Sequence, residues 1–337
     1  MPDEEHTASA VPANPNTTKK ARAVLAYLRN LPKGDAKRVI SGQFIGHPLA
    51  GLYDNAANLP HRIHEQTGKW VGFLGGDYGR GFERQDEDVL TPALIEHWNN
   101  GGLVGASVHW HNPRTGRGHQ TTPKPHIPNL LDPNSAVHGD WMEELSYVAD
   151  KLTVLRDAGA VVLWRPFNEC TCRIPKWWQQ HSYKDFCALY RQVFDYMTKT
   201  RGLDNLLWEY HACRRKNEKR LWADHYYPGA ELVDIVGLTA DREVLPDTDA
   251  FVGDYQRLVA LGKPFAFGEA NMDTRLHPEH EVERFIRGIK THYPRAVYFM
   301  CWGGSFGLHN RPERTRALLN DPWVINRDEL RIPGLSR

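Results

Sequence analysis

The sequence lacks an excess of charge of either sign, with 42 lysine and arginine residues against 41 aspartate and glutamate residues. Proteins that bind nucleic acid or anionic membranes usually carry a basic surplus or a basic cluster. The sequence also lacks any apolar run long enough to cross a bilayer as a helix. We therefore expect neither nucleic acid nor a membrane as a partner.

Cysteine is scarce as well, and a secretory signal is missing. Five cysteines are too few, and odd in number, to form a disulfide framework. The first residues are acidic, polar and interrupted by proline, without the apolar segment of a signal peptide. Location stays open: the protein is secreted if a signal peptide has been removed and cytoplasmic otherwise. The same composition predicts disorder over residues 1–16, which leaves 17–337 as one domain.

Two patterns typical of other folds are absent: an internal repeat, and a glycine-rich phosphate loop after the first apolar run. The chain instead alternates short apolar runs with helical patterns. The apolar runs cover residues 38–43, 70–77, 102–110, 160–169, 205–211, 232–238, 264–270 and 296–302. Helical spacing covers residues 18–31, 54–66, 91–100, 140–158, 184–200, 250–261, 280–291 and 312–319, with a weaker candidate at 218–224. This alternation predicts a single-domain (β/α)8 barrel, which we expect to be a monomer.

The apolar runs end on polar or aromatic side chains. Active residues of such barrels lie at the carboxyl ends of the strands. These ends carry Gln43, Asp77, His109, Glu169, His211, Glu269 and Trp302. The 11 tryptophans and 13 tyrosines support the same interpretation, because sugars pack on flat aromatic rings, although several rings must simply fill the core. The pattern favours a polysaccharide or oligosaccharide site at the mouth of the barrel.

Two glutamates lie on opposite sides of the predicted barrel. Glu169 ends the fourth apolar run, and Glu269 ends the seventh. Cleavage of a glycosidic bond uses two such carboxyl groups, one protonated as the acid and the other ionised. Strand alternation places Arg165 on the face of Glu169, one layer lower, where a cation favours an ionised carboxylate. The alternative is a structural ion pair between Arg165 and Glu169 without chemistry.

Two short motifs have some similarity to metal-binding patterns. Cys170 and Cys172 form a Cys-x-Cys pair without a second pair of cysteines, which is a weak zinc pattern. His109 and His111 are similar to the His-x-His of metal-dependent hydrolase barrels, but those barrels carry it on the first strand and not the third. We therefore expect no metal and no cofactor.

The cysteines after Glu169 leave a disulfide question open. Cys170 and Cys172 are too close in sequence to bridge easily to each other. In an exported protein, Cys172 could instead pair with Cys213 or Cys187, and the sequence does not decide between them.

The chain carries a series of short motifs in a consistent order from about Val39 onward. They are "VISGQ" at 39–43, "SVHWHNP" at 107–113, "WRPFNE" at 164–169, "WW" at 177–178, "LYRQVFDYMTKTRGLDNLLWEY" at 189–210, "YPGAELVDIVGL" at 227–238, "KPFAFGEAN" at 263–271 and "CWGG" at 301–304. In order and spacing the series resembles glycoside hydrolase family 26, the β-mannanase family among the retaining (β/α)8 glycosidases.

The resemblance implies roles for individual residues. It implies that Glu169 is the acid/base and Glu269 the nucleophile. The further contacts that it implies are His109 and Trp302 at the subsite before the cleaved bond, Arg165 beside the nucleophile, Trp177 and Trp178 on the leaving-group side, and Asp77 and Trp110 as additional sugar contacts.

The chain departs from the family pattern at three places. Asn168 stands where the family has histidine, and in the wider clan this asparagine binds the sugar hydroxyl at C2. Mannose carries that hydroxyl axially, whereas glucose and xylose carry it equatorially, so Asn168 indicates an altered substrate. Thr239 and Asp241 replace an Asp-x-Tyr whose tyrosine bonds the nucleophile, and Asp241 would repel an ionised Glu269 unless paired or turned away. The "CTC" at 170–172 replaces a Met-Asn-Gly-like turn.

The residues and the resemblance together predict a retaining endo-β-glycanase that hydrolyses β-mannan or a related β-linked polysaccharide by double displacement with two glutamates. One alternative is a related enzyme that acts on xylan or β-glucan. The other is a carbohydrate-binding barrel that has lost its chemistry, which the departures at Asn168 and Thr239 would allow but the two glutamates oppose.

Overall fold

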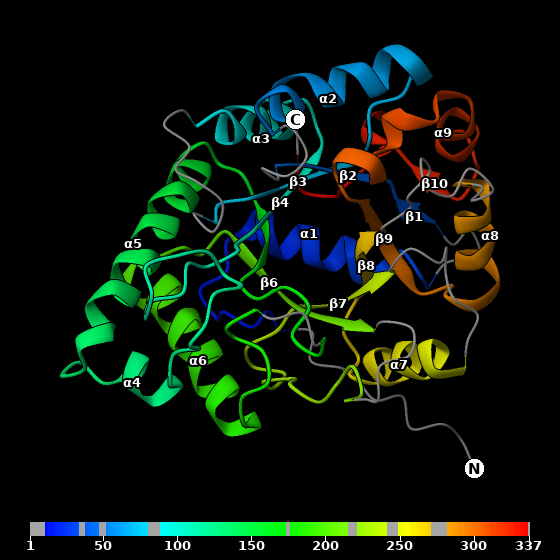
Figure 1. Ribbon diagram of the computed structural model, residues 1–337. Helices are drawn as coiled ribbons and strands as arrows, with labels where there is room; N and C mark the ends of the chain where they lie inside the picture. The colour runs from blue at the N-terminus through cyan, green and yellow to red at the C-terminus, as the bar shows by residue number, and fades with distance from the viewer. Residues whose placement is uncertain are drawn as a thin grey trace.

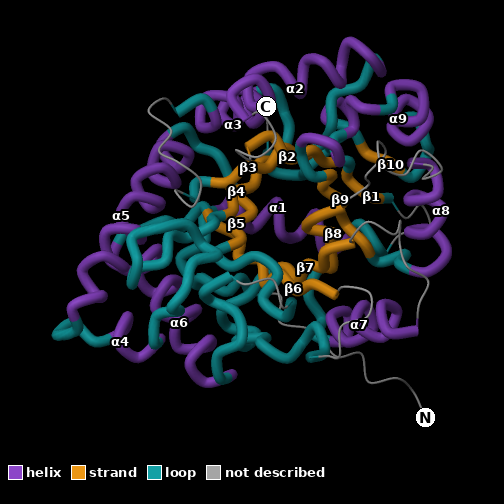
Figure 2. Tube along the Cα trace, viewed as in Figure 1, coloured by secondary structure: helices purple, strands orange, loops and turns teal. Residues whose placement is uncertain are grey.

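The computed structural model describes residues 11–33, 38–46, 52–79, 88–172, 176–214, 221–240, 249–270 and 282–335. At its centre is a closed ring of parallel strands wrapped by helices, as Figure 1 and Figure 2 show. The ring confirms the (β/α)8 barrel expected from the alternation of apolar runs and helical patterns.

The ring consists of β2 (Gly42–Gly46), β3 (Phe73–Asp77), β4 (Leu103–Ser107), β5 (Val162–Arg165), β6 (Leu206–Arg214), β7 (Ile235–Ala240), β8 (Phe265–Ala270) and β9 (Ala296–Cys301). Each strand pairs in parallel with the next, and β9 pairs with β2 to close the ring. Nearly every strand residue is buried, because helices cover the outer face and side chains fill the interior. That is why the strands are continuous apolar runs in the sequence.

The helices between the strands agree with the helical spacing. They are α2 (Leu52–Thr67), α3 (Leu90–Asn99), α5 (Ala136–Asp157), α6 (Tyr183–Asp195) with a π-helical turn at Tyr196–Thr200, α7 (Asp249–Ala260), α8 (Val282–His292) and α9 (Pro312–Leu319). The weak helix candidate at 218–224 is wrong where it can be checked, because 221–224 form coil and turn; its residues 218–220 lie outside the described ones. None of the helices in the described ranges is long and apolar enough to span a membrane.

The amino-terminal floor of the barrel is closed by elements from both ends of the chain. Helix α1 (Lys19–Asn30) lies behind the ring in the view of Figure 2. The Thr18 hydroxyl caps it by accepting a hydrogen bond from the amide of Ala21, 3.2 Å away. Strand β1 (Val39–Ile40) pairs in parallel with β10 (Val324–Ile325).

Residues 11–16 are part of this floor, although the sequence predicts disorder over 1–16. The Ala13 amide donates to Asp234 Oδ1 at 2.8 Å, and the Asn14 side chain donates to Asp204 Oδ1 at 2.8 Å. Both aspartates precede barrel strands, so the ordered domain begins before residue 17. Residues 1–10 lie outside the described residues.

The longest connection follows β4 and extends to α5. It contains a short helix that the sequence did not reveal, α4 (Ile127–Leu131). Elsewhere, after β9, two three-residue 3-10 turns cover Gly304–Phe306 and Leu308–Asn310. Asn112 anchors the long connection, because its side chain donates to the carbonyls of Thr121 and Pro123 at 2.9 and 3.0 Å. This connection brings His119 to the mouth of the barrel beside His109, with ring centroids 4.6 Å apart.

Candidate active site

Glu269 is held by regular strand structure. It lies on β8 opposite Thr239 of β7 in the parallel register. Arg165, the last residue of β5, reaches it from across the barrel, with Nη2 3.3 Å from Glu269 Oε1. The other guanidinium nitrogen donates to the Gly268 carbonyl at 2.8 Å, so Arg165 is fixed by the same strand that carries Glu269.

Glu169 is held differently, because it lies beyond the end of its strand. β5 ends at Arg165, and Pro166 has no amide hydrogen with which to continue the ladder. Glu169 itself has a left-handed backbone with φ of 53°. The strand alternation that placed Arg165 below Glu169 therefore does not extend that far, and Arg165 forms its ion pair with Glu269 instead.

A lysine that the sequence did not reveal is the ionic partner of Glu169. Lys176 Nζ lies 2.9 Å from Glu169 Oε2, and both side chains are almost completely buried. The Gln179 side chain donates to the Glu169 carbonyl at 2.7 Å, and the Glu169 amide lies 3.3 Å from His211 Nδ1. The only signal in the sequence is a charged residue directly before the "WW" at 177–178, and it does not identify a partner.

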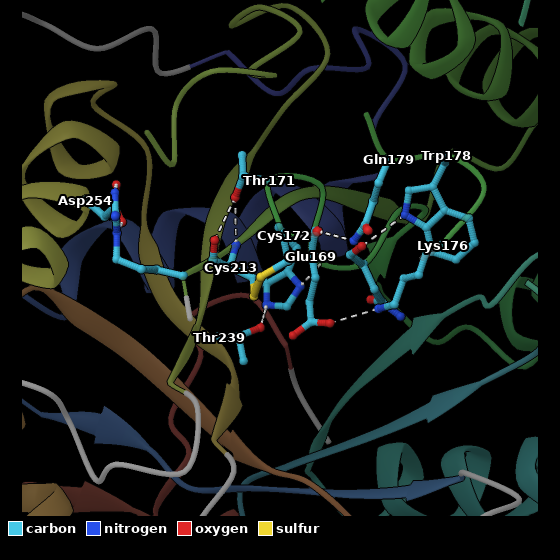
Figure 3. The surroundings of a disulfide bond; sticks show 12 residues. Glu169, Thr171, Cys172, Lys176, Trp178, Gln179, Cys213, Thr239 and Asp254 are labelled. Atoms are coloured by element: carbon cyan, nitrogen blue, oxygen red, sulfur yellow. Dashed lines mark hydrogen bonds and ion pairs between the residues drawn. A yellow bond between two sulfur atoms is a disulfide. The ribbon is translucent and has the colours of Figure 1, made fainter. Parts of the chain in front are cut away.

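Cys172 and Cys213 form a disulfide beside Glu169 (Figure 3). Their sulfur atoms and a Glu169 carboxylate oxygen all lie within 4.8 Å of one another. Because each sulfur is bonded to the other, neither is available as a thiolate ligand. This pairing is one of the two that the sequence left open, and Cys170 and Cys187 are free cysteines.

A third buried glutamate lies deeper in the barrel. Glu209 is on β6, and the Tyr298 hydroxyl donates to its Oε2 at 2.7 Å. A Cβ atom at Gly237 or Gly268 would lie 2.2 or 2.4 Å from Glu209 Oε1, so both positions require glycine to leave room for the carboxyl group. The signal for Glu209 in the sequence is an isolated acidic residue within an apolar run.

Burial and neighbouring charges shift the protonation of these carboxyl groups. The pKa of Glu269 is raised to about 8 in total. Burial is the largest cause; Arg165 opposes it, the charge of Glu169 adds to it, and Lys176 opposes it. Burial also raises the pKa of Glu209, against the opposing charge of Arg165. Burial thus makes Glu269 and Glu209 take up a proton more readily than exposed glutamates, although Arg165 opposes this at both.

Asp77 orients His109, in contrast to the sugar contact that the resemblance implies for it. Its carboxylate lies 2.7 Å from His109 Nδ1 and accepts hydrogen bonds from Ser107 Oγ at 2.8 Å and the amide of Gly79 at 2.7 Å. Burial alone would raise the pKa of Asp77, but His109 and these hydrogen bonds outweigh it and hold the pKa well below its usual range. Burial lowers the pKa of His109, so at neutral pH the neutral ring donates its Nδ1–H to Asp77.

The two histidines of the "HWH" motif have different partners. His109 Nδ1 is bonded to Asp77, whereas His111 Nδ1 lies 3.3 Å from Glu144 Oε1 on α5. They are thus not arranged to share a metal through these nitrogens. His211 is a further neutral ring in the site, because burial, Arg165 and then Lys176 lower its pKa well below the usual value.

The tryptophans predicted at the site fall into two groups. Trp302 is half-buried and stacks on Phe44 with ring centroids 4.0 Å apart, which leaves it suited to a sugar platform. It also lies edge-on to His109, with ring centroids 6.5 Å apart.

The other three indoles are fully buried, so in this structure they present no face to a sugar. Trp110 donates its indole N–H to the Pro166 carbonyl at 2.7 Å, and Trp177 donates to the Trp110 carbonyl at 3.1 Å. Trp178 donates to the Asn168 carbonyl at 3.0 Å. Two of these indoles thus donate to carbonyls of the segment that leads to Glu169, and the role of all three as sugar contacts stays a prediction.

Asn168 is fully buried next to Glu169. Its side-chain nitrogen lies 3.5 Å from His109 Nδ1, which is too long for a strong hydrogen bond, and its Oδ1 has no hydrogen-bond partner among the described residues. Thr239, the other departure, places its hydroxyl 3.4 Å from His211 Nε2. Asp241 lies outside the described residues.

Comparison with known proteins identifies a family. The sequence model of the family described as glycosyl hydrolase family 26 matches residues 13–329. A mannan endo-1,4-beta-mannosidase from Bacillus subtilis strain 168 is 35% identical, over 98% of this chain and 91% of that protein. The mannan endo-1,4-beta-mannosidase A and B of Caldalkalibacillus mannanilyticus is 34% identical, over 94% of this chain. This chain spans only 63% of the length of that second protein.

Solved structures agree with the fold. The structure of Bacillus subtilis mannanase man26 superposes with a TM-score of 0.84 at 31% identity, covering 97% of this chain and 98% of that one. The crystal structure of the YdhT protein from the same species gives a TM-score of 0.83 at 32% identity, covering 95% and 96% of the two chains.

Proposed function

Because the chain belongs to glycosyl hydrolase family 26, we propose that it is a retaining endo-1,4-β-mannanase with Glu269 as the nucleophile and Glu169 as the acid/base. One observation carries the proposal. Two buried carboxyl groups meet at the mouth of the barrel, each paired with its own cation, Arg165 for Glu269 and Lys176 for Glu169. The relatives at 33–35% identity are mannan endo-1,4-beta-mannosidases, which supports the substrate class.

The first step forms a glycosyl-enzyme ester. A Glu269 oxygen attacks the anomeric carbon, the glycosidic bond breaks, and Glu169 gives its proton to the departing oxygen. Arg165 lies 3.3 Å from Glu269 and is anchored on the Gly268 carbonyl, so its charge favours the ionised nucleophile against the effect of burial. In the second step Glu169 takes a proton from water, which breaks the ester and releases the sugar with its configuration retained.

The protonation of the pair sets the pH dependence. Productive chemistry needs the proton on Glu169 and the charge on Glu269. Burial raises the pKa of Glu269 to about 8, against the opposing charge of Arg165. The rate follows a bell-shaped pH profile, because it needs one proton on the pair, neither two nor none.

The sugar before the cleaved bond packs on Trp302. Trp302 is half-buried and supported by Phe44, so it offers a rigid ring face. His109, oriented by Asp77, lies at the edge of this platform. Asn168 follows as a polar contact beside the acid/base, where it binds a sugar hydroxyl at C2.

Asn168 also favours a second candidate, a retaining enzyme of the same kind that acts on xylan or β-glucan. The asparagine suits an equatorial hydroxyl at C2, which xylose and glucose have and mannose lacks. A non-catalytic barrel is less well supported, because both carboxyl groups are present and each has a cation within ion-pair distance, Arg165 for Glu269 and Lys176 for Glu169.

A substrate screen tests the proposal. The purified protein is incubated with β-mannan, glucomannan, xylan and mixed-linkage β-glucan, and the products are followed by chromatography and by NMR of the newly formed anomeric proton. We expect internal cleavage of mannan with β products first. Cleavage of xylan or glucan alone would support the second candidate, and α products or a carboxylate separation well above ~5–5.5 Å in a crystal structure would contradict a retaining mechanism.

A further inference from the structure

The disulfide of the site lies against the residue that we assign as acid/base. Cys172 follows Glu169 by three residues, and the Cys172 and Cys213 sulfurs lie within 4.8 Å of a Glu169 carboxylate oxygen. Both cysteines are buried, with 2% and 4% of their surface exposed, so the bond belongs to the interior of the site and not to its rim.

The disulfide is one element of a seam between the Glu169 loop and β6. The Cys170 amide donates to the His211 carbonyl at 3.0 Å, which continues strand-like pairing past the end of β5. The Thr171 hydroxyl then donates to the Cys213 carbonyl at 2.8 Å and accepts from the Cys213 amide at 3.1 Å. Figure 3 shows the disulfide and the Thr171 contacts side by side at this seam. The covalent bond joins the same two segments next to these hydrogen bonds.

The seam holds a backbone that would not stay in place by itself. Glu169 has φ of 53°, a left-handed conformation that is unfavourable for residues other than glycine. Such a conformation persists only where the surroundings over-determine it, and it recurs at functional sites. Gln179 holds the Glu169 carbonyl from the opposite side at 2.7 Å. The acid/base is thus held between Gln179 on one side and the seam to β6 on the other.

We propose that the Cys172–Cys213 disulfide is a positioning element for proton transfer: it fixes the Glu169 carboxyl group on the line to the leaving oxygen. The proposal rests on the acid/base role assigned to Glu169 above. Without the bond, the loop relaxes from the left-handed conformation and the carboxyl group shifts. A displacement of about 1 Å costs on the order of 100-fold in rate when geometry is the catalytic contribution.

The leaving group of the substrate separates positioning from general stability. A mannoside with a 2,4-dinitrophenyl leaving group departs without protonation, whereas a manno-oligosaccharide needs the acid. We therefore compare kcat/KM of Cys172→Ala/Cys213→Ala on mannotetraose and on 2,4-dinitrophenyl β-mannobioside. We expect a loss of about 100-fold on mannotetraose and less than about fivefold on the aryl substrate. Azide, which attacks the glycosyl-enzyme without a general base, should accelerate turnover of the aryl substrate by the variant.

Matched variants keep the test decisive. Cys187→Ala removes a free cysteine on α6 and should match wild type on both substrates. Thr171→Val keeps the disulfide but removes two hydrogen bonds of the same seam, and it should show the same leaving-group pattern with a loss below about tenfold. If the double cysteine variant does not fold, Thr171→Val carries the test. Equal losses on the two substrates, or no loss on either, would overturn the proposal.

A parallel Glu169→Ala variant distinguishes this inference from the function on which it rests. If Glu169→Ala loses activity on mannotetraose, keeps the aryl substrate and responds to azide, the acid/base assignment stands whatever the cysteine variants do. If Glu169→Ala shows no such pattern, the assignment itself has failed, and the behaviour of the cysteine variants then reports only on stability.

Discussion

Glu269 and Glu169 lie in one site, but Glu269 belongs to a regular strand and Glu169 to a loop. Glu269 lies within β8, in register with β7, and its cation comes from the end of β5. Glu169 lies four residues beyond the end of β5, in a left-handed conformation, and its cation Lys176 follows it by seven residues in the same connection. The first is fixed by the barrel, and the second is fixed by a loop that a disulfide, hydrogen bonds and packed indoles hold.

The difference matches the two roles that we propose. A nucleophile acts along one line toward the anomeric carbon, and a rigid strand holds that line. An acid/base must instead serve a leaving oxygen and then a water molecule, and a loop connection allows its surroundings to be adjusted without altering the barrel. We therefore expect substitutions around Glu269 and substitutions around Glu169 to have separable effects.

The largest effect is expected at the strand-mounted carboxyl group. Replacing Glu269 with alanine removes the atom that forms the covalent intermediate, so kcat/KM falls by on the order of 10⁴-fold or more on every substrate, activated or not. Steady-state kinetics on mannan and on an aryl mannobioside check this. If the aryl substrate alone kept its rate, the two glutamates would have exchanged roles.

Replacing Arg165 with methionine should lower the stability of the fold through the carboxyl groups on the strands and leave the Glu169 loop unaffected. The change leaves Glu269 and Glu209 buried without their cation, which costs about 3–5 kcal/mol in the free energy of unfolding. Arg165 lowers the pKa of both groups, so the loss should be larger at pH 8 than at pH 5, where they take up protons. Denaturant unfolding measures it. The control is Arg191→Met, an exposed arginine paired with Glu231, which should lose under about 1 kcal/mol.

Replacing Glu269 with glutamine should stabilise the fold at alkaline pH. The pKa of Glu269 is about 8 in the folded protein against 4.5 as its ordinary value, so the folded state retains a proton that the unfolded chain releases. Wild-type stability is unaffected below pH 4.5 and falls as the pH rises toward 8. Glutamine does not titrate, so the variant should gain on the order of 2–4 kcal/mol over wild type at pH 8 and little at pH 4.5. Thermal unfolding at both pH values tests this, with the exposed Glu65→Gln as control; equal gains at the two pH values would contradict it.

The smallest effect is expected from replacing Lys176, the ion-pair partner of Glu169. Its ammonium contacts the Glu169 carboxylate and lowers the pKa of Glu269, so Lys176→Met should move the pH profile of kcat/KM to higher pH by about one unit. Lys199→Met, an exposed lysine, serves as the comparison. An unmoved profile would show that Lys176 does not tune the pair.

The same contrast explains what the sequence could predict. Glu269 was found with its neighbours because β8 is regular, so apolar periodicity and strand order place it correctly. Alternation failed at Glu169 because Pro166 ends the ladder and a left-handed residue follows, and local sequence does not predict such a conformation for glutamate. The contact between Lys176 and Glu169 depends on the conformation of that loop, and sequence periodicity does not predict loop conformation.

Tryptophan shows a second limit of sequence reasoning. Trp110 and Trp302 follow the ends of β4 and β9, whereas Trp177 lies in the connection after β5, and of the three only Trp302 retains an exposed face. An indole has one apolar body and one N–H, so it can satisfy a buried carbonyl as readily as it can receive a sugar. Residue type alone does not separate a buried ring from an exposed one, because that difference depends on packing.

The floor of the barrel has a consequence for how the substrate reaches the site. Residues 11–16 hydrogen-bond to aspartates that precede β6 and β7, and β10 pairs with β1, so both ends of the described chain run along the side opposite Glu169 and Glu269. The described residues that close this floor therefore stay clear of the polysaccharide, and they can hold the base of the barrel together without obstructing entry of the substrate.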